Sequence, residues 1–269
     1  MNTKTLKWPE DWSVPSDDEE RLLASTLLPH LKLLSPKVVE LIVKDNAKHS
    51  ERWSDSLLAL GIQPDIYLWD GSPVTFPGIK RHAGQKEIHA FRNKLKLESN
   101  INSLKLDDNN YPKELWSFAL RNRKTNKTNP PGHSLAHIID HKDYNSRNGE
   151  ELLGFSTSEK KNLLAGLYTS SVNTLWIPNV FLKPTDHSSK IRSLLIQLVD
   201  VHYSDICEPL PHGLKFNPEI AGNGWNLNDF PRPAIKGDVQ HIQSFLAYRS
   251  DQINDLLNSG LKEKLSVDS

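Results

Sequence analysis

The chain has 269 residues, of which 37% are hydrophobic and 25% are charged, a composition typical of a globular protein that buries a sizeable core. Lysine and arginine total 33 and aspartate and glutamate total 33, so a polycation that coats nucleic acid by bulk charge is excluded. Its one cysteine, Cys207, excludes an intramolecular disulfide framework and a zinc site of the Cys₄ or Cys₂His₂ type.

Neither a membrane span nor a secretory signal is expected. The most apolar stretch, residues 194–199, is far shorter than the roughly 20 residues that a bilayer requires. The amino terminus, MNTKTLKWPEDWS, has no apolar h-region. We therefore expect a cytoplasmic protein that has no membrane partner.

The first segment, residues 1–125, is predicted to be mostly helical with a small β-hairpin. Ser16 and Glu19 fit a capping box, so a helix should follow and end at Pro29. Further helices are predicted from Ser35-Pro36 onward, over residues 50–60 and over residues 85–96. The hairpin is predicted from residues 65–71 and 74–76, and residues 112–120 are ambiguous between helix and strand.

The second segment, residues 126–205, begins within a basic loop over residues 121–132 and is predicted to contain two strands and a helix. The strands are expected over residues 134–139 and 163–168, and the helix over residues 190–203, with Thr185 or Ser188 as its N-cap. The third segment, residues 206–269, should hold a proline- and glycine-rich loop and a last helix over residues 238–259, capped by Gly260. The fold class is therefore α+β.

An aspartate-histidine pair at the end of the first predicted strand is the clearest chemical signal. The carboxylate of Asp140 is a hard oxygen ligand that suits a divalent cation. The imidazole of His141 has an ordinary pKa near 6.5, so it can accept a proton from water at neutral pH. Such a pair is useful for phosphodiester hydrolysis.

These residues resemble the HNH, or ββα-metal, nuclease family. Ile138-Ile139-Asp140-His141 resembles the first strand of that motif, Asn162-Leu163 its entry into the second strand, and Asn173 its last metal ligand. The resemblance implies that Asp140 and Asn173 hold the metal and that His141 activates water. It also implies that Asn162 hydrogen-bonds across the loop and orients the strand that carries His141.

A second register of the same motif stays open. Ala136-His137-Ile138 resembles the start of other HNH members, and in that register His137 would be the base. We prefer Asp140-His141 because it supplies a metal ligand and a base together. A solvated turn that happens to contain Asp-His is the alternative without chemistry.

Local positive charge supports a nucleic-acid substrate. Candidate phosphate contacts are Arg121, Arg123, Lys124, Lys127, Lys142 and Arg147. A second basic group, Lys80-Arg81-His82 with Lys86, lies near Tyr67, Trp69 and Phe76, which either stack on bases or belong to the core.

The sequence thus predicts a metal-dependent HNH-type endonuclease that acts on DNA. Mg²⁺ is the expected metal, with Mn²⁺, Zn²⁺ and Ni²⁺ as alternatives. The resemblance also suggests bacterial defence or restriction, with a partner protein from such a system. Two other readings remain: an RNase with the same site, and a non-catalytic module that binds nucleic acid or protein.

Overall fold

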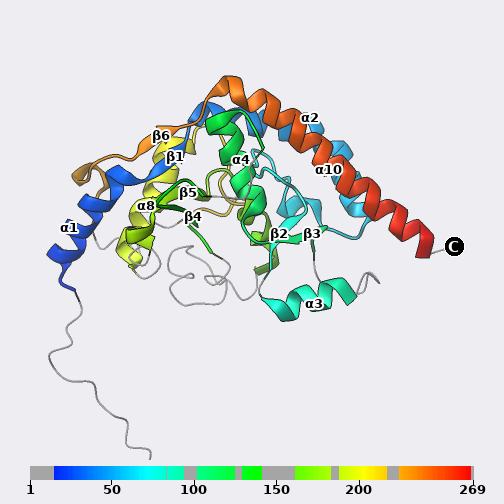
Figure 1. Ribbon diagram of the computed structural model, residues 1–269, viewed down its shortest axis with the longest axis horizontal. Helices are drawn as coiled ribbons and strands as arrows, with labels where there is room; N and C mark the ends of the chain where they lie inside the picture. The colour runs from blue at the N-terminus through cyan, green and yellow to red at the C-terminus, as the bar shows by residue number, and fades with distance from the viewer. Residues whose placement is uncertain are drawn as a thin grey trace, which may run out of the picture.

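The computed structural model describes most of the chain. The described residues are 15–82, 84–93, 102–124, 129–140, 161–182, 188–216 and 224–267. Within them helices and short strands combine in a mixed α+β fold, as the composition and patterning predicted (Figure 1). No helix in these ranges has the length and apolar character needed to cross a bilayer.

The regular elements alternate along the chain. The α-helices are α1 (Asp17–Leu27), α2 (Pro36–Ala59), α3 (Gln85–Asn93), α4 (Asn110–Arg121), α8 (Ser189–Tyr203) and α10 (Val239–Val267). The strands are β1 (Lys32–Leu34), β2 (Ile79–Arg81), β3 (Lys105–Asp107), β4 (His133–His137), β5 (Thr174–Pro178) and β6 (Ala234–Lys236). Short 3₁₀ helices are η1 (Leu28–His30), η2 (Pro64–Ile66), η4 (Lys161–Thr169), η5 (Asn179–Phe181) and η6 (Leu227–Asp229).

A four-stranded sheet in the order β4-β5-β1-β6 joins distant parts of the sequence. β5 pairs antiparallel with both β4 and β1, whereas β6 runs parallel to β1. The first four residues of β5 are buried, because β5 is a central strand whose β-branched and aromatic side chains pack on both faces. β2 and β3 form a separate parallel pair. All three segments predicted from the sequence therefore contribute strands to one sheet.

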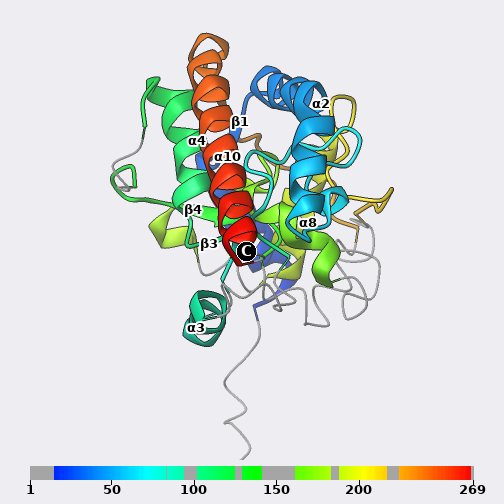
Figure 2. The same cartoon turned by 90° about the vertical axis from the view of Figure 1, so that its right-hand side faces the viewer.

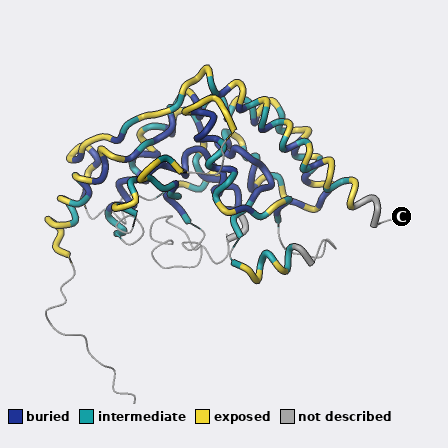
Figure 3. Tube along the Cα trace, in the orientation of Figure 1, coloured by how far each residue is buried: buried dark blue, intermediate teal, exposed yellow. Residues whose placement is uncertain are grey.

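Helices α2, α4 and α10 enclose the core beside the β2–β3 pair. α10 packs against both α2 and α4, and Figure 2 shows α10 between the other two. The largest fully buried apolar side chains include Trp53, Trp116, Tyr67, Phe76 and Phe245. The exposed residues of α10 lie along its outer side (Figure 3).

Arg249 of α10 is completely buried and joins α10 to α2 and to the segment before β2. Its guanidinium is ion-paired with Asp45 of α2 at 2.5 Å and donates to the Asn46 side chain at 2.9 Å. It also donates to the backbone carbonyl of Thr75 at 3.1 Å. A buried cation is tolerated when it is paired and hydrogen-bonded, as this one is.

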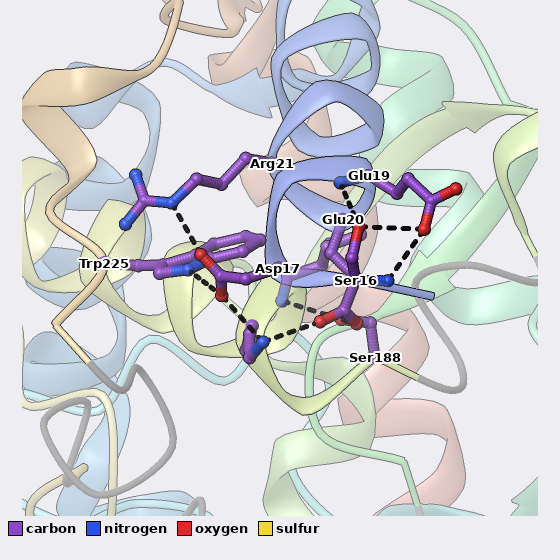
Figure 4. A network of polar contacts seen from close by, with 9 residues as sticks. Ser16, Asp17, Glu19, Glu20, Arg21, Ser188 and Trp225 are labelled. Carbon is purple, nitrogen blue, oxygen red and sulfur yellow. Dashed lines mark hydrogen bonds and ion pairs between the residues drawn. The ribbon is translucent and has the colours of Figure 1, made fainter. Parts of the chain in front are cut away.

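A polar network fastens α1 to α8 (Figure 4). The Ser16 and Glu19 side chains each bond the other residue's backbone N–H, which confirms the capping box. Asp17 then pairs with Lys190 at 2.8 Å and accepts the indole N–H of Trp225 at 3.0 Å. The first turn of α1 is thereby docked on the amino-terminal end of α8.

The helix starts predicted from local signals are confirmed. α2 begins at the predicted Ser35-Pro36, α3 begins at residue 85, and Ser188 caps α8 through the Ile191 N–H. The ambiguous stretch over residues 112–120 is helical, within α4. The predicted third helix is instead the second half of α2, which runs without a break for 24 residues.

Three sequence predictions are wrong. The strand over residues 65–71 is replaced by η2 and turns, because Ile66 and Tyr67 turn into the core. The strand over residues 163–168 is η4, and the second strand is β5, farther along the chain. Gly260 does not end the last helix, which continues to Val267.

Candidate functional site

β4, β5 and α8 follow one another in the order strand, strand, helix, and they meet just after β4. The β4–β5 ladder pairs His137 with Thr174, and the Ile138 N–H donates to the Asn173 carbonyl at 3.0 Å. From α8, the buried Arg192 donates to the Ile138 carbonyl at 2.8 Å. The helix is thereby linked to the end of the first strand.

Asn173 fixes the turn that leads into Asp140. Its Oδ1 accepts the Ile139 N–H at 2.8 Å, and its Nδ2 donates to the carbonyls of Ile139 at 3.0 Å and Leu167 at 2.9 Å. The residue is 4% exposed. This side chain does the bracing that the resemblance assigned to Asn162, whose side chain lies outside the described residues.

The contacts of Asn173 give it a structural role beside the ligand role that the resemblance implied. Its Oδ1 and Nδ2 both bond buried backbone, whereas a metal ligand needs an oxygen that faces the ion. Within the described ranges, no group of three or more histidine, cysteine, aspartate or glutamate side chains is arranged to hold a metal.

Asp140 lies at the surface end of this turn and is ion-paired. Its Oδ1 accepts from Nη1 of Arg81 at 2.9 Å. The two side chains are 30% and 24% exposed, respectively. Solvent and ligands can therefore reach this pair, although it sits against a buried floor.

That floor is formed by Asp107 and Tyr168. Asp107 is the register partner of Arg81, at the carboxyl ends of the parallel strands β3 and β2. Its carboxylate accepts the Tyr168 hydroxyl at 2.9 Å and two donors from the first turn of α4. Burial, and then the neighbouring Asp107 charge, raise the pKa of Tyr168, while Arg81 acts in the opposite direction. Tyr168 is therefore a neutral donor at physiological pH.

His137, the alternative base, is held against the same floor. Its Nε2 lies 3.0 Å from the carbonyl oxygen of Tyr168, which can only accept, so this nitrogen carries the proton. The imidazole also stacks on the Tyr168 ring, with 5.4 Å between the centroids. These contacts orient His137 toward η4.

Several predicted site residues cannot be placed. The preferred base His141 and three of the predicted phosphate contacts lie outside the described residues; those contacts are Lys127, Lys142 and Arg147.

The other predicted phosphate contacts, Arg121, Arg123 and Lys124, are exposed at the carboxyl end of α4. The amino end of α4 bonds Asp107, so these cations and Asp140 lie toward opposite ends of a helix of 12 residues. Such a helix is about 18 Å long. The structure does not gather them around Asp140.

Two residues of the second basic group, Lys80 and Arg81, form ion pairs with different partners. Lys80 is bonded to Glu87 of α3 at 2.7 Å, whereas Arg81 is bonded to Asp140. Tyr67 and Phe76 are fully buried, so these two aromatic rings belong to the core and do not stack on bases.

Sequence reasoning missed the link between Arg81 and Asp140. The two residues are 59 positions apart, and no spacing rule connects them. The available signal was the location of Arg81 in a basic group next to a predicted strand.

Comparison with protein-family models, with curated proteins and with solved structures gives no match for this chain.

Proposed function

We propose that this chain is a metal-dependent HNH-type endonuclease that hydrolyses phosphodiester bonds in DNA. The observation that supports the proposal is the brace between Asn173 and Ile139. It ties the second strand of a strand-strand-helix unit to the turn that carries Asp140. A site residue held by rigid elements is what catalysis requires.

In this proposal Asp140 contributes a carboxylate to the metal site, and His141, the next residue, removes a proton from the attacking water. The divalent cation, Mg²⁺ by preference, would supply charge neutralisation at the phosphate and at the leaving oxygen. Asn173 positions the turn and is not a ligand. His137 remains the alternative base, and its bond to Tyr168 fixes its ring.

The exposed Arg121, Arg123 and Lys124 would contact the DNA backbone away from the scissile bond. The length of α4, about 18 Å, corresponds to about five nucleotide steps of B-form DNA. Exposed cations of this kind contribute DNA affinity that decreases as the salt concentration rises and that does not depend on the DNA sequence.

The test is cleavage of supercoiled plasmid and of single-stranded RNA in Mg²⁺, in Mn²⁺ and in EDTA. We expect metal-dependent nicking of plasmid by the native protein. Asp140→Ala and His141→Ala should lower the rate by about 10²- to 10⁴-fold. His133→Ala, on the same strand but at its other end, is the matched control and should stay within about threefold of the native rate.

Equal rates for His141→Ala and the native protein, with loss in His137→Ala, would move the base to His137. Cleavage of RNA alone would make the enzyme an RNase. If no substrate is cleaved in any metal, the endonuclease proposal is wrong.

The second candidate is a binding module without catalysis. It is favoured by the ion pair that already occupies Asp140. Binding of duplex DNA without cleavage, unchanged by Asp140→Ala, would support it. A role in bacterial defence is part of the first proposal, and co-purification of a partner protein from the native host tests it.

A further inference from the structure

Arg81 stands out among the cations around Asp140, because it is fixed at its base and accessible at its tip. It is the last residue of β2, where the paired strands β2 and β3 end side by side. Its side chain is 24% exposed, and Nη1 reaches Asp140 at 2.9 Å. An arginine fork matches the oxygens of a phosphate better than an ammonium does.

We propose that Arg81 binds the phosphate of the nucleic acid at this site and that Asp140 holds the guanidinium in place until the phosphate displaces the carboxylate. This inference rests on the proposed function, since it names the phosphate ligand of the same site. In the absence of DNA, the Arg81–Asp140 pair keeps the site closed to anions.

The neighbouring groups leave Arg81 suited to this role. The carboxylate of Asp107 is 7% exposed and is occupied by three donors, including the Tyr168 hydroxyl. Tyr168 stays neutral and offers no competing charge. Lys80, one residue earlier on β2, is already paired with Glu87 at 2.7 Å.

The Arg81–Asp140 ion pair is also weak enough for Arg81 to exchange partners. Both side chains are partly solvated, and ion pairs at such exposure contribute little to stability. A phosphate offers the same guanidinium a bidentate, charge-assisted contact. The exchange would free the Asp140 carboxylate at the moment when Arg81 engages the substrate.

The test is a double-mutant cycle on DNA binding, measured in EDTA so that no cleavage occurs. The probe is a fluorescein-labelled duplex oligonucleotide followed by fluorescence anisotropy at low salt. The proteins are the native chain, Arg81→Gln, Asp140→Asn and the double variant. Lys80→Gln is the matched control, since it removes one positive charge from the adjacent position on the same strand.

We expect Arg81→Gln to weaken binding about tenfold and Asp140→Asn to tighten it about fivefold. The double variant should bind like Arg81→Gln if the carboxylate acts through the arginine, as proposed. Lys80→Gln should change affinity less than about threefold. Arg81→Lys should recover part of the affinity but not all of it. Urea unfolding of each variant verifies that the fold is retained.

Native affinity in Arg81→Gln, or an Asp140→Asn gain that persists in the double variant, would overturn the inference. Failure to bind duplex DNA at low salt would overturn it too. A native protein that cleaves plasmid in Mg²⁺ but shows no coupling in EDTA would refute the role of Arg81 alone. A coupled cycle without cleavage in any metal would support Arg81 while refuting the nuclease.

Discussion

Replacing Asn173 with alanine removes the brace behind Asp140 and tests whether that brace is structural. The variant loses three hydrogen bonds, to the Ile139 N–H, the Ile139 carbonyl and the Leu167 carbonyl. Each is worth about 1 kcal/mol, and backbone groups left unsatisfied in a buried turn add to the loss. We expect the free energy of unfolding to fall by about 3–4 kcal/mol.

The assay is urea unfolding at 25 °C, followed by tryptophan fluorescence and circular dichroism. Asn179→Ala is the matched control, because the exposed Asn179 side chain accepts a hydrogen bond from the Ser134 hydroxyl at the opposite end of the β4–β5 pair. Its loss should cost less than about 1 kcal/mol. If the free energy of unfolding falls by the same small amount in both variants, the Asn173 hydrogen bonds do not stabilise the turn more than an exposed bond does, and the support for the proposed site disappears.

The isosteric variant Asn173→Asp adds a dependence on pH. Its carboxylate would face the carbonyl oxygens of Ile139 and Leu167, where the amide now donates. Burial and these oxygens would raise its pKa in the folded state above the unfolded value of about 3.9. The folded state then binds more protons than the unfolded one, so stability falls as the pH rises from about 4 through the raised folded pKa. Unfolding curves of this variant that do not change between pH 4 and pH 7 would contradict the assigned contacts.

Three further predictions concern the framework around the site. Arg249→Met should lower the free energy of unfolding by about 3–5 kcal/mol, because it removes the ion pair with the partly buried Asp45 and the donor to the buried Asn46 side chain. Lys44→Met, in an exposed pair, should cost less than about 0.5 kcal/mol, and urea titrations compare the two variants. Gly166→Ala should destabilise by about 3 kcal/mol in the same assay, since its Cβ would lie 2.3 Å from the Ile66 carbonyl oxygen. The lysine ammonium at the start of α8, with further hydrogen bonds, lowers the pKa of Asp17 to about 2. A carboxyl whose pKa is lower in the folded state stabilises the fold at pH values above its unfolded pKa, and this stabilisation is lost as the pH falls through the folded pKa. The Tm difference between the native protein and Asp17→Asn should therefore be full above about pH 4 and shrink toward pH 2.

Local chemistry in the sequence was enough to predict where helices begin. Ser16 with Glu19, Ser35 before Pro36, and Ser188 each satisfy or replace orphan donors within a few residues of themselves, so their signal needs no tertiary information. The helix ends were predicted less well. Gly260 lies inside α10, where its missing side chain leaves room for Leu60, the residue that follows α2.

The sequence analysis placed the second strand too early in the chain, because a contact between distant residues decides the local structure there. Residues 163–168 are as apolar as a strand, but Gly166 lies against the Ile66 carbonyl, and this close approach favours the compact turns of η4. The strand lies at Thr174–Pro178 instead. The asparagine that enters the true second strand is Asn173, so the bracing role went to Asn162 in the sequence analysis by the same error.

The turn before Asp140 is held from several directions by residues that no local motif unites. Asn173, the residue before β5, and Arg192 of α8 hydrogen-bond to the turn, and Arg81 of β2 contacts the Asp140 carboxylate itself. The sheet extends this dependence, because Trp176 of β5 is paired both with β4 and with β1, whose Lys32 lies near the start of the chain. The strand-strand-helix unit is therefore embedded in the α+β body. Strands β1 and β2 therefore connect the first hundred residues of the chain to the candidate site.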